Sequence, residues 1–417
     1  MKLGLIGYPL GHSWSKPIHD FMIGCDYQMY ELKPEELEGF LKAKDFDGLN
    51  VTIPYKQAVM EYLDEIDETA ATIGAVNTIV NRNGILKGYN TDWLGFTEML
   101  KNNNIDVEGR KVALLGSGGA SKACRTALEK LGADVSVISR RAVRENTITY
   151  EEMYADSPEY QVIVNATPVG LYPECDSIPV DLSKFENLEA VVDIIANPLR
   201  THLLFEAKCR SLKTAGGLEM LVAQAWHADL LYTGKQLDPS LMKDCLDMLY
   251  RDRRSIVLIG MPTSGKTTVS ALLAEECGRD VIEMDDEIVE ILGTSIKECF
   301  ADKGEAYFRW LEQDVAKDLR SGGRFIISCG GGVIKTKEAM RFLSENSIVV
   351  WLKRGIEQLF PTDSRPLSDN DDALQRLYAE REPLYELYSD VTADNTGSLA
   401  DTVREILFKT GEEEVRR

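Results

Sequence analysis

Short apolar runs, each followed by glycine, proline or a polar turn, recur along the whole chain and predict buried β-strands. They occupy residues 2–7, 48–56, 111–116, 134–141, 256–259, 325–334 and 347–352. Longer stretches with a helical pattern, such as residues 121–132 and 304–312, lie between them. Apolar strands that alternate with helices are typical of parallel sheets covered by helices, so the sequence predicts an α/β fold.

The length of the chain predicts more than one domain. A chain of 417 residues is too long for one ordinary hydrophobic core, and two or three domains are expected. A helical stretch over residues 239–253 leads almost directly into the apolar strand near residue 255, so one domain begins there.

The charge is acidic throughout. Asp and Glu outnumber Lys and Arg by 68 to 47, and the excess divides about equally between the two sides of residue 253. Neither part is therefore built to bind nucleic acid, and anionic substrates must be held by a few local Lys and Arg side chains. The eight cysteines are scattered without a C-x-x-C pair, which indicates reduced thiols.

The N-terminal residues enter a predicted strand at once, which leaves no room for a signal peptide, and no apolar run approaches membrane-spanning length. We therefore expect a cytoplasmic protein with no membrane partner. The sequence leaves its oligomeric state open.

Residues 255–270 carry the strongest local signal. An apolar run ends at Gly260, and the spacing G-x-x-x-x-G-K-T places Gly265, Lys266 and Thr267 at the start of a helix, which is the pattern of a P-loop. Backbone N–H groups of such a loop wrap phosphate oxygens, the lysine reaches the β- and γ-phosphates, and the threonine hydroxyl ligates Mg²⁺. A plain glycine turn is the alternative, but all four fixed positions match.

Residues 110–141 predict a dinucleotide-binding βαβ unit. The segment GSGGAS follows a strand and opens a helix, so Gly116, Gly118 and Gly119 let the backbone meet a pyrophosphate. The next strand ends in Ser139 and Arg140, where enzymes that use NAD carry an acidic residue. A guanidinium suits a 2′-phosphate, so we predict NADP.

Several polar residues occupy turns beside the predicted strands of the first 100 residues. Ser13 and Ser15 precede a helix, Lys56 follows a strand, and three more turn residues are Asn77, Asn90 and Asp92. Taken singly, each has an ordinary explanation as a helix cap, a turn former or a solvated charge. Their order along the chain gives them meaning.

That order resembles shikimate dehydrogenase over nearly all of residues 1–250. The family patterns S-x-S, N-V-T-x-P-x-K, A-V-N-T and N-T-D match residues 13–15, 50–56, 75–78 and 90–92, and further matches are residues 116–121, 165–171 and 217–225. The resemblance implies substrate contacts at Ser13, Ser15, Thr52, Asn77, Asn90, Asp92 and Gln224. It implies NADP(H) contacts at Gly116, Gly118, Gly119, Ala120, Ser139, Arg140, Arg144, Gly217 and Met220.

The same resemblance implies that Lys56 and Asp92 form the catalytic pair for reduction of 3-dehydroshikimate by NADPH. The ammonium group would stabilise and protonate the oxygen of the reduced ketone, while the carboxylate orients the ammonium group. Ala196 stands where the family commonly has Tyr. Loss of that hydroxyl contact would weaken binding or turnover.

Residues 254–417 resemble shikimate kinase. The matching patterns are the P-loop, an aspartate pair near residues 285–286, G-E-x-x-F-R at 304–309, three glycines at 330–332, R-P-L at 365–367 and R-x-P-x-Y at 381–385. The resemblance implies shikimate contacts at Asp285, Arg309, Gly331, Gly332 and Arg381, and ATP contacts at Gly260, Gly265, Lys266, Thr268 and Arg365, with Thr267 on Mg²⁺. The family pattern differs at Thr263, a usual glycine, and at Glu283, a usual aspartate.

The two resemblances support each other because the product of the first reaction is the substrate of the second. They imply a substrate domain over residues 1–100 and 218–250, a Rossmann NADP-binding domain over 101–217, and a P-loop, nucleoside-monophosphate-kinase-like domain over 254–417. A metabolite-sensing regulatory protein and a quinate/shikimate dehydrogenase of degradation are alternatives. The retained Lys and Asp pairs argue against the first, and Arg140 with the fused kinase argues against the second.

Overall fold

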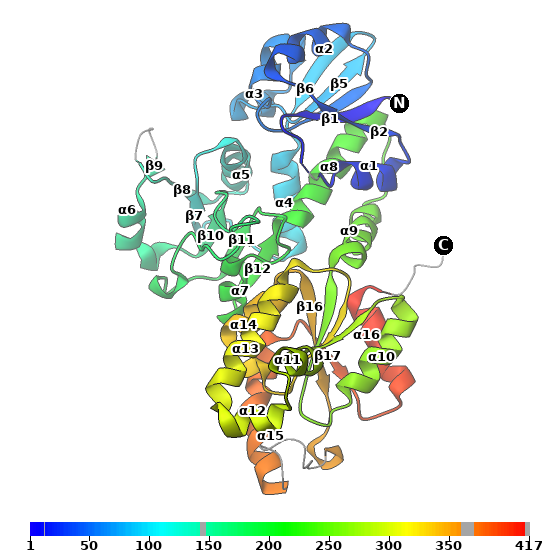
Figure 1. Cartoon of the computed structure of the whole chain (residues 1–417). Helices are drawn as coiled ribbons and strands as arrows, with labels where there is room; N and C mark the ends of the chain where they lie inside the picture. The colour runs from blue at the N-terminus through cyan, green and yellow to red at the C-terminus, as the bar shows by residue number, and fades with distance from the viewer. Residues whose placement is uncertain (12, 142–146, 360–370, 413–417) are drawn as a thin grey trace. The chain divides into compact units, whose positions relative to one another are not determined.

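The computed structural model describes residues 1–11, 13–141, 147–359 and 371–412 (Figure 1). The chain divides into two compact units, unit 1 with Met1–Asn197 and Leu212–Leu246, and unit 2 with Pro198–Ser211 and Asp247–Arg417. Residues 198–211, which the sequence placed in the NADP-binding domain, therefore cluster with unit 2. The boundary near residue 246 lies inside helix α9 (Ser240–Arg253). The three-domain division stays a prediction.

The first sheet of unit 1 is mixed. Its order is β2 (Tyr27–Glu31), β1 (Leu3–Gly7), β3 (Gly48–Val51), β5 (Thr78–Arg82), β6 (Ile85–Tyr89) and β4 (Glu65–Ile66). Strand β1 pairs in parallel with both neighbours, and β5 runs antiparallel to β3 and β6. The flanking helices are α1 (Ser15–Ile23), α2 (Leu37–Ala43) and α3 (Glu68–Ile73). Fully buried residues such as Leu3, Ile6 and Leu49 form its core. This packing fixes the position of β3 and so of the segment after it, which carries Lys56.

The second sheet of unit 1 is parallel throughout. Its order is β12 (Lys213–Gly216), β11 (Ala190–Asp193), β10 (Val162–Asn165), β7 (Lys111–Leu115), β8 (Asp134–Ile138) and β9 (Thr147–Ile148). The helices are α4 (Asp92–Asn102), α5 (Gly119–Lys130), α6 (Tyr150–Ala155) and α8 (Gly217–Thr233), of which α4 and α8 run side by side (Figure 1). The strand order changes direction at β7 and β10, as in doubly wound dinucleotide-binding folds, which confirms the predicted Rossmann sheet.

Unit 2 contains one five-stranded parallel sheet. Its order is β14 (Val281–Glu283), β15 (Ile326–Ser328), β13 (Ser255–Ile259), β16 (Ser347–Lys353) and β17 (Val391–Asp394). The helices are α7 (His202–Cys209), the part of α9 from Asp247 on, α10 (Lys266–Cys277), α11 (Met284–Leu292), α12 (Ile296–Asp302), α13 (Gly304–Asp318), α14 (Lys337–Ser344), α15 (Asp371–Tyr388) and α16 (Leu399–Thr410). The predicted parallel sheet with covering helices is confirmed, because β13 and β16 are buried along almost their whole length.

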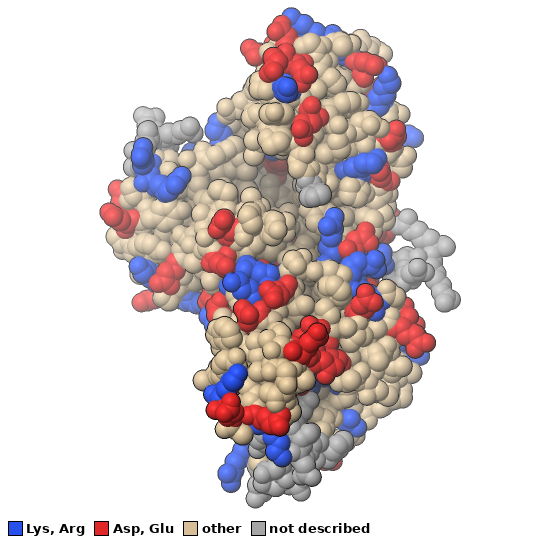
Figure 2. Space-filling view, in the orientation of Figure 1, with Lys and Arg blue, Asp and Glu red and all other residues tan. Residues whose placement is uncertain are grey.

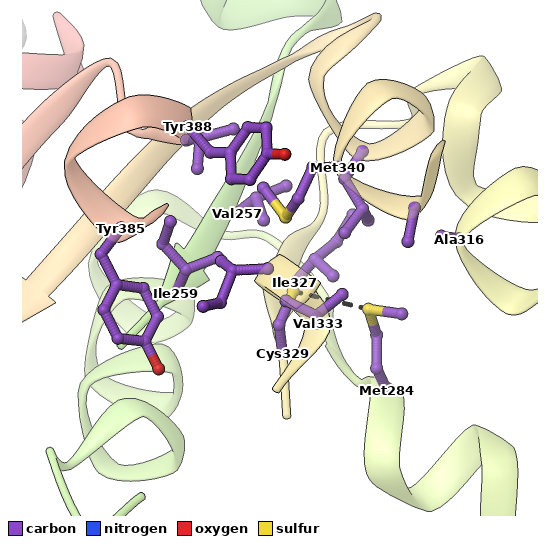
Figure 3. Packing of buried hydrophobic residues seen from close by; sticks show 14 of the residues in the cluster. Val257, Ile259, Met284, Ala316, Ile327, Cys329, Val333, Met340, Tyr385 and Tyr388 are labelled. Carbon is purple, nitrogen blue, oxygen red and sulfur yellow. Dashed lines mark hydrogen bonds between the residues drawn. The ribbon is translucent and has the colours of Figure 1, made fainter. Parts of the chain in front are cut away.

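Figure 3 shows the apolar core on one face of this sheet. Val257, Ile259 and Ile327 project from the strands toward Met284 of α11 and Met340 of α14. Packing of this kind holds the P-loop strand and the start of α11 in fixed places. These two elements carry the residues that the sequence assigned to phosphoryl transfer.

Helix α7 contributes to the same core. The Phe205 side chain is 2% exposed, and its ring stacks on Tyr388 at 6.1 Å between centroids. Arg200 and Lys208 pair with the Asp390 carboxylate at 2.7 and 2.5 Å. Burial alone would raise the pKa of Asp390, but the two cations outweigh it and lower that pKa to about 2. Residues 198–211 are thus a structural part of unit 2.

Candidate active sites

A lysine–aspartate pair lies at the centre of a polar cluster in unit 1. Lys56 Nζ donates to Asp92 Oδ2 at 2.7 Å, and the second oxygen of Asp92 accepts from Asn77 Nδ2 at 2.9 Å. Asn77 Nδ2 also lies 3.3 Å from Gln224 Oε1, which reaches the cluster from α8. The side chains of Lys56 and Asp92 are 24% and 12% exposed, so the pair is accessible but shielded.

Neighbouring polar residues hold this cluster in place. Asn90 Oδ1 accepts from the Asp92 backbone N–H at 3.0 Å, and Asn90 Nδ2 donates to the Ala75 carbonyl at 3.0 Å. The turn before α4 is therefore fixed on both sides, which orients the Asp92 carboxylate. Thr91 also enters the cluster, since its backbone N–H donates to Asn77 Oδ1 at 2.7 Å.

Two serines and a threonine lie just after strands of the first sheet, Ser15 as the first residue of α1. Ser13 and Ser15 are linked to each other by an Oγ–Oγ hydrogen bond of 3.2 Å at the start of α1. Thr52 follows β3, and its backbone N–H donates to the Ile6 carbonyl at 2.9 Å. The structure thus brings Lys56, Asn77, Asp92 and Gln224 into one hydrogen-bonded network, and it places the two serines in a separate pair.

The glycine-rich turn of residues 116–121 fits a pyrophosphate. Gly116 has φ 105°, which only glycine adopts readily, and Ser121 Oγ donates to its carbonyl at 2.6 Å. A Cβ added at Gly118 or Gly119 would meet no protein atom within 4 Å, so the N-terminus of α5, including Ala120, is open to a ligand. The serine at the third fingerprint position stabilises the turn.

The remaining predicted NADP contacts lie at two strand ends. Ser139 and Arg140 directly follow β8, and the Arg140 side chain is exposed. Gly217 begins α8, where a Cβ would lie 2.1 Å from the Ile194 carbonyl oxygen, so no larger residue fits. Met220 lies one turn later and is buried. Arg144 lies outside the described residues.

The P-loop of unit 2 has the predicted strand–loop–helix geometry. Gly265 has φ 93°, and a Cβ on Gly260 would lie 2.7 Å from the Leu352 carbonyl oxygen, so both positions require glycine. The buried Lys266 ammonium group donates to the carbonyls of Gly260 and Met261 at 3.0 and 2.9 Å. Thr263 has φ 62°, a left-handed conformation that explains why glycine is usual there.

Oxygen donors beside the P-loop fit a magnesium ion. Thr267 Oγ1 lies 3.3 Å from Glu283 Oε2, and Ser270 Oγ donates to Glu283 Oε1 at 3.0 Å. Mg²⁺ prefers hydroxyl, carboxylate and phosphate oxygens and keeps several waters, so a single threonine with a nearby carboxylate suits it. Glutamate is longer than the aspartate usual at this position, and the Glu283 side chain reaches the helix that bears Thr267. Thr268 follows it and is exposed.

A partly buried ion-pair cluster surrounds Arg309 on α13. Arg309 Nη1 donates to Glu312 Oε2 at 2.7 Å, and Nε and Nη2 each lie 3.2 Å from Glu305 Oε1. The Glu312 side chain is only 1% exposed, and burial raises its pKa to about 7 although Arg309 opposes the rise. Glu305 also pairs with Lys335 at 3.0 Å.

The three-glycine segment after β15 brings the other predicted acceptor residues together. A Cβ at Gly330 would lie 2.6 Å from Asp285 Oδ1, and one at Gly332 would lie 2.2 Å from Arg309 Nη2. Arg381 Nη1 donates to the Gly331 carbonyl at 2.7 Å. One glycine segment is therefore surrounded by the side chains of Asp285, Arg309 and Arg381. Because glycine has no Cβ, the segment leaves room for these side chains. Arg365 lies outside the described residues.

Two residues of this site were not predicted from the sequence. Glu312 holds Arg309, and Tyr385 donates its hydroxyl to the same Gly331 carbonyl as Arg381 at 2.6 Å. Helical spacing offers a signal for both, because Glu312 follows Arg309 by three residues and Tyr385 follows Arg381 by four. Both then lie on the helix face that carries the arginine.

On the face of the molecule that Figure 2 draws, charged side chains form no broad field of one sign. Figure 2 shows acidic and basic side chains interspersed over the visible face of the molecule. Anionic ligands therefore depend on the individual lysines and arginines named above. Among the described residues, no helix is both long enough and apolar enough to cross a bilayer.

The fold and the two sites define an enzyme with a dinucleotide-dependent dehydrogenase unit and a P-loop kinase unit. Family models match in both parts: the shikimate dehydrogenase substrate binding domain over residues 5–79 and shikimate kinase over residues 262–410. The chain is 41% identical to the NADP(+) shikimate dehydrogenase of Caldanaerobacter subterraneus subsp. tengcongensis over 258 residues, covering 56% of this chain and 92% of that protein. The enzyme of Clostridium beijerinckii is 40% identical over 255 residues, covering 57% and 94%.

Solved structures agree with this assignment. The shikimate 5-dehydrogenase of Thermus thermophilus, crystallised with NADP(H) and shikimate, matches with a TM-score of 0.54 at 36% identity, covering 58% of this chain and 97% of that one. Shikimate dehydrogenase 1 of Peptoclostridium difficile matches with a TM-score of 0.54 at 37% identity, covering 59% and 97%. The chain belongs to the shikimate dehydrogenase family, with a shikimate kinase domain following in the same polypeptide.

Proposed function

We infer that the chain is a bifunctional enzyme of the shikimate pathway. Unit 1 reduces 3-dehydroshikimate to shikimate with NADPH, and unit 2 transfers the γ-phosphoryl group of ATP to shikimate with Mg²⁺, giving shikimate 3-phosphate. The observation that carries the proposal is that each family match includes residues of a converging polar group, Lys56 with its partner Asp92 in unit 1, and Lys266, Arg309 and Arg381 in unit 2. The product of the reaction in unit 1 is then the substrate of the reaction in unit 2.

The Lys56–Asp92 pair suits the reduction chemically. Bound NADPH supplies a hydride to the ketone carbon, and the electron pair of the C=O bond moves onto the oxygen. The Lys56 ammonium group transfers one proton to that oxygen, and in the reverse reaction the neutral amine accepts it. Asp92 holds the ammonium group at 2.7 Å, and Asn77 fixes the carboxylate from its other side. Asn77, Asn90, Gln224, Thr52 and the two serines bind the substrate hydroxyls and carboxylate in this proposal.

The P-loop and the arginine cluster suit phosphoryl transfer. Asp285 orients the 3-hydroxyl and takes its proton as the new O–P bond forms and the bond to the leaving ADP breaks. Lys266 leaves its two carbonyl partners for the phosphate oxygens, which bear more charge. Arg309 and Arg381 clamp the shikimate carboxylate. Arg381 Nε supports this role, since it is buried without a hydrogen-bond partner among the described residues.

A coupled assay tests the whole proposal. Purified full-length protein is supplied with 3-dehydroshikimate, NADPH, ATP and Mg²⁺, and both NADPH oxidation and shikimate 3-phosphate are measured. We expect Lys56→Ala to abolish NADPH oxidation while phosphorylation of added shikimate stays normal. Lys266→Ala should give the opposite pattern, so each variant controls for the folding of the other.

Failure of the folded wild type to oxidise NADPH with this substrate would overturn the dehydrogenase assignment, and failure to phosphorylate shikimate would overturn the kinase assignment. A metabolite-sensing protein would bind the ligands without turnover. We place both reactions in the cytoplasm, because the scattered thiols suit a reducing compartment and both nucleotide cosubstrates belong to central metabolism.

A further inference from the structure

A lysine lies beside the arginine cluster of unit 2, and the proposed phosphoryl transfer does not use it. Lys335 Nζ donates to Glu305 Oε1 at 3.0 Å. The same oxygen lies 3.2 Å from both Nε and Nη2 of Arg309. One carboxylate oxygen is therefore shared between two cations, and only the arginine is assigned to the substrate.

The backbone fixes the place of this lysine. Lys335 ends the short 3-10 helix η6 (Val333–Lys335), and its N–H donates to the Gly332 carbonyl at 3.0 Å. Val333, which Figure 3 labels, is fully buried in the apolar core and anchors this turn. A Cβ at Gly332 would lie 2.2 Å from Arg309 Nη2. The turn after the three glycines thus holds Lys335 next to the carboxylate that Arg309 faces.

The charges around Arg309 show what the lysine contributes. Arg309 faces two carboxyl groups, those of Glu305 and Glu312, which would together cancel its charge toward an anionic substrate. Burial raises the pKa of Glu312 to about 7, which removes part of its negative charge at neutral pH. The hydrogen bond from Lys335 is the largest influence on the pKa of Glu305 and lowers it, so Glu305 stays charged. Lys335 therefore neutralises a carboxylate that would otherwise offset Arg309.

We propose that Lys335 is a positioning residue for the acceptor of the kinase reaction. By holding the Glu305 carboxylate, it leaves the guanidinium group of Arg309 with the charge and the N–H groups that bind the carboxylate of shikimate. Lys335 acts through Glu305 and does not itself contact the substrate. The inference rests on the proposed kinase function and deepens it, because that proposal assigns Arg309 to the shikimate carboxylate.

The variant Lys335→Met tests this in the full-length protein. Methionine keeps an unbranched apolar side chain and removes the charge. The side chains of Lys335 and Glu305 are 33% and 36% exposed, so solvent screens their interaction. We therefore expect KM for shikimate to rise roughly two- to fivefold, the range of a partly exposed ion pair. KM for ATP and kcat at saturating shikimate should stay unchanged, and Lys335→Arg, which keeps the charge, should restore the wild-type KM for shikimate.

A double-mutant cycle separates this role from a direct contact with the substrate. In a Glu305→Gln background the side chain at 305 carries no charge, so Lys335→Met should no longer change KM for shikimate. A lysine that bound the substrate itself would raise that KM equally in both backgrounds when removed. Lys337→Met is the matched control, because Lys337 lies on the same segment but pairs with Glu206 at 2.8 Å. This variant should match the wild type in KM for shikimate.

Three results would overturn the inference while leaving the proposed function intact: an unchanged KM for shikimate in Lys335→Met, an equal rise in Lys337→Met, or an equal rise in the Glu305→Gln background. If Lys335→Met yields too little folded protein, Lys335→Gln removes the same charge. It should raise the same KM and spare that for ATP, and a wild-type KM for shikimate would count against the role. Failure of the folded wild type to phosphorylate shikimate would instead defeat the proposed function itself.

Discussion

The buried glutamate beside Arg309 makes the stability of unit 2 depend on pH. Glu312 is 1% exposed, and burial raises its pKa from 4.5 to about 7. Because the folded pKa is the higher one, the folded state retains a proton that the unfolded chain releases between pH 4.5 and pH 7. Stability should therefore fall as the pH rises through this window and level off above it.

The magnitude follows from the shift. Between pH 5 and pH 8, a rise from 4.5 to about 7 corresponds to roughly 2–3 kcal/mol of unfolding free energy, at about 1.4 kcal/mol per pKa unit. The variant Glu312→Gln does not titrate, so its stability relative to the wild type should increase by that amount from pH 5 to pH 8. All other groups titrate alike in the two proteins, so their contributions to the pH dependence of the unfolding free energy cancel in the comparison.

Urea unfolding of the full chain at both pH values would measure this, with loss of amide-exchange protection in peptides of α13 and β15 reporting on unit 2 alone. Glu338→Gln is the matched control, because Glu338 also pairs with an arginine, Arg341 at 2.9 Å, but is 45% exposed. It should show no comparable pH dependence. A stability difference between Glu312→Gln and the wild type that is the same at pH 5 and pH 8 would refute the reasoning.

Three further changes test the arrangement of unit 2. Arg309→Ala should raise KM for shikimate roughly tenfold or more, the effect of losing a charge-assisted hydrogen bond, and leave KM for ATP within about twofold; equal losses in steady-state kinetics would contradict its place on the acceptor side. The left-handed conformation of Thr263 costs a non-glycine residue roughly 1–2 kcal/mol. Thr263→Gly removes this cost, but the greater chain entropy of glycine in the unfolded state offsets roughly 0.5–1 kcal/mol of the gain. Thermal inactivation of kinase activity should therefore shift slightly upward, and a downward shift would contradict the strain. Asp390→Asn leaves Arg200 and Lys208 without their anion and should destabilise unit 2 by roughly 3–5 kcal/mol in urea unfolding, whereas a neutral result would show that α7 is not anchored by this carboxylate.

Sequence motifs were sufficient to locate a site wherever its function depends on residues that are neighbours in the chain. The P-loop spacing from Gly260 to Thr267 and the glycine turn from Gly116 to Ser121 each lie between a strand and a helix, as predicted. In such motifs the backbone itself forms the site, so the glycine positions that a Cβ would block are visible in the sequence. The parallel sheets followed from the apolar strands for the same local reason.

Contacts between distant segments could not be read from the sequence. Lys56 and Asp92 are 36 residues apart, and only the sheet and α4 bring their charges within 2.7 Å. Family resemblance named both residues, but composition and spacing alone gave each an ordinary explanation. The Lys335 bond to Glu305 had no sequence signal, because the two residues are 30 positions apart.

The sequence by itself determined the fold class, the two nucleotide-binding turns and the order of the catalytic motifs, since these depend on local periodicity and on glycine at fixed spacing. Only the tertiary structure decided that residues 198–211 pack with unit 2 and that Glu312 is buried with a pKa of about 7. Burial and the pairing of charges arise from surrounding segments. A residue's own neighbours in the chain do not specify them.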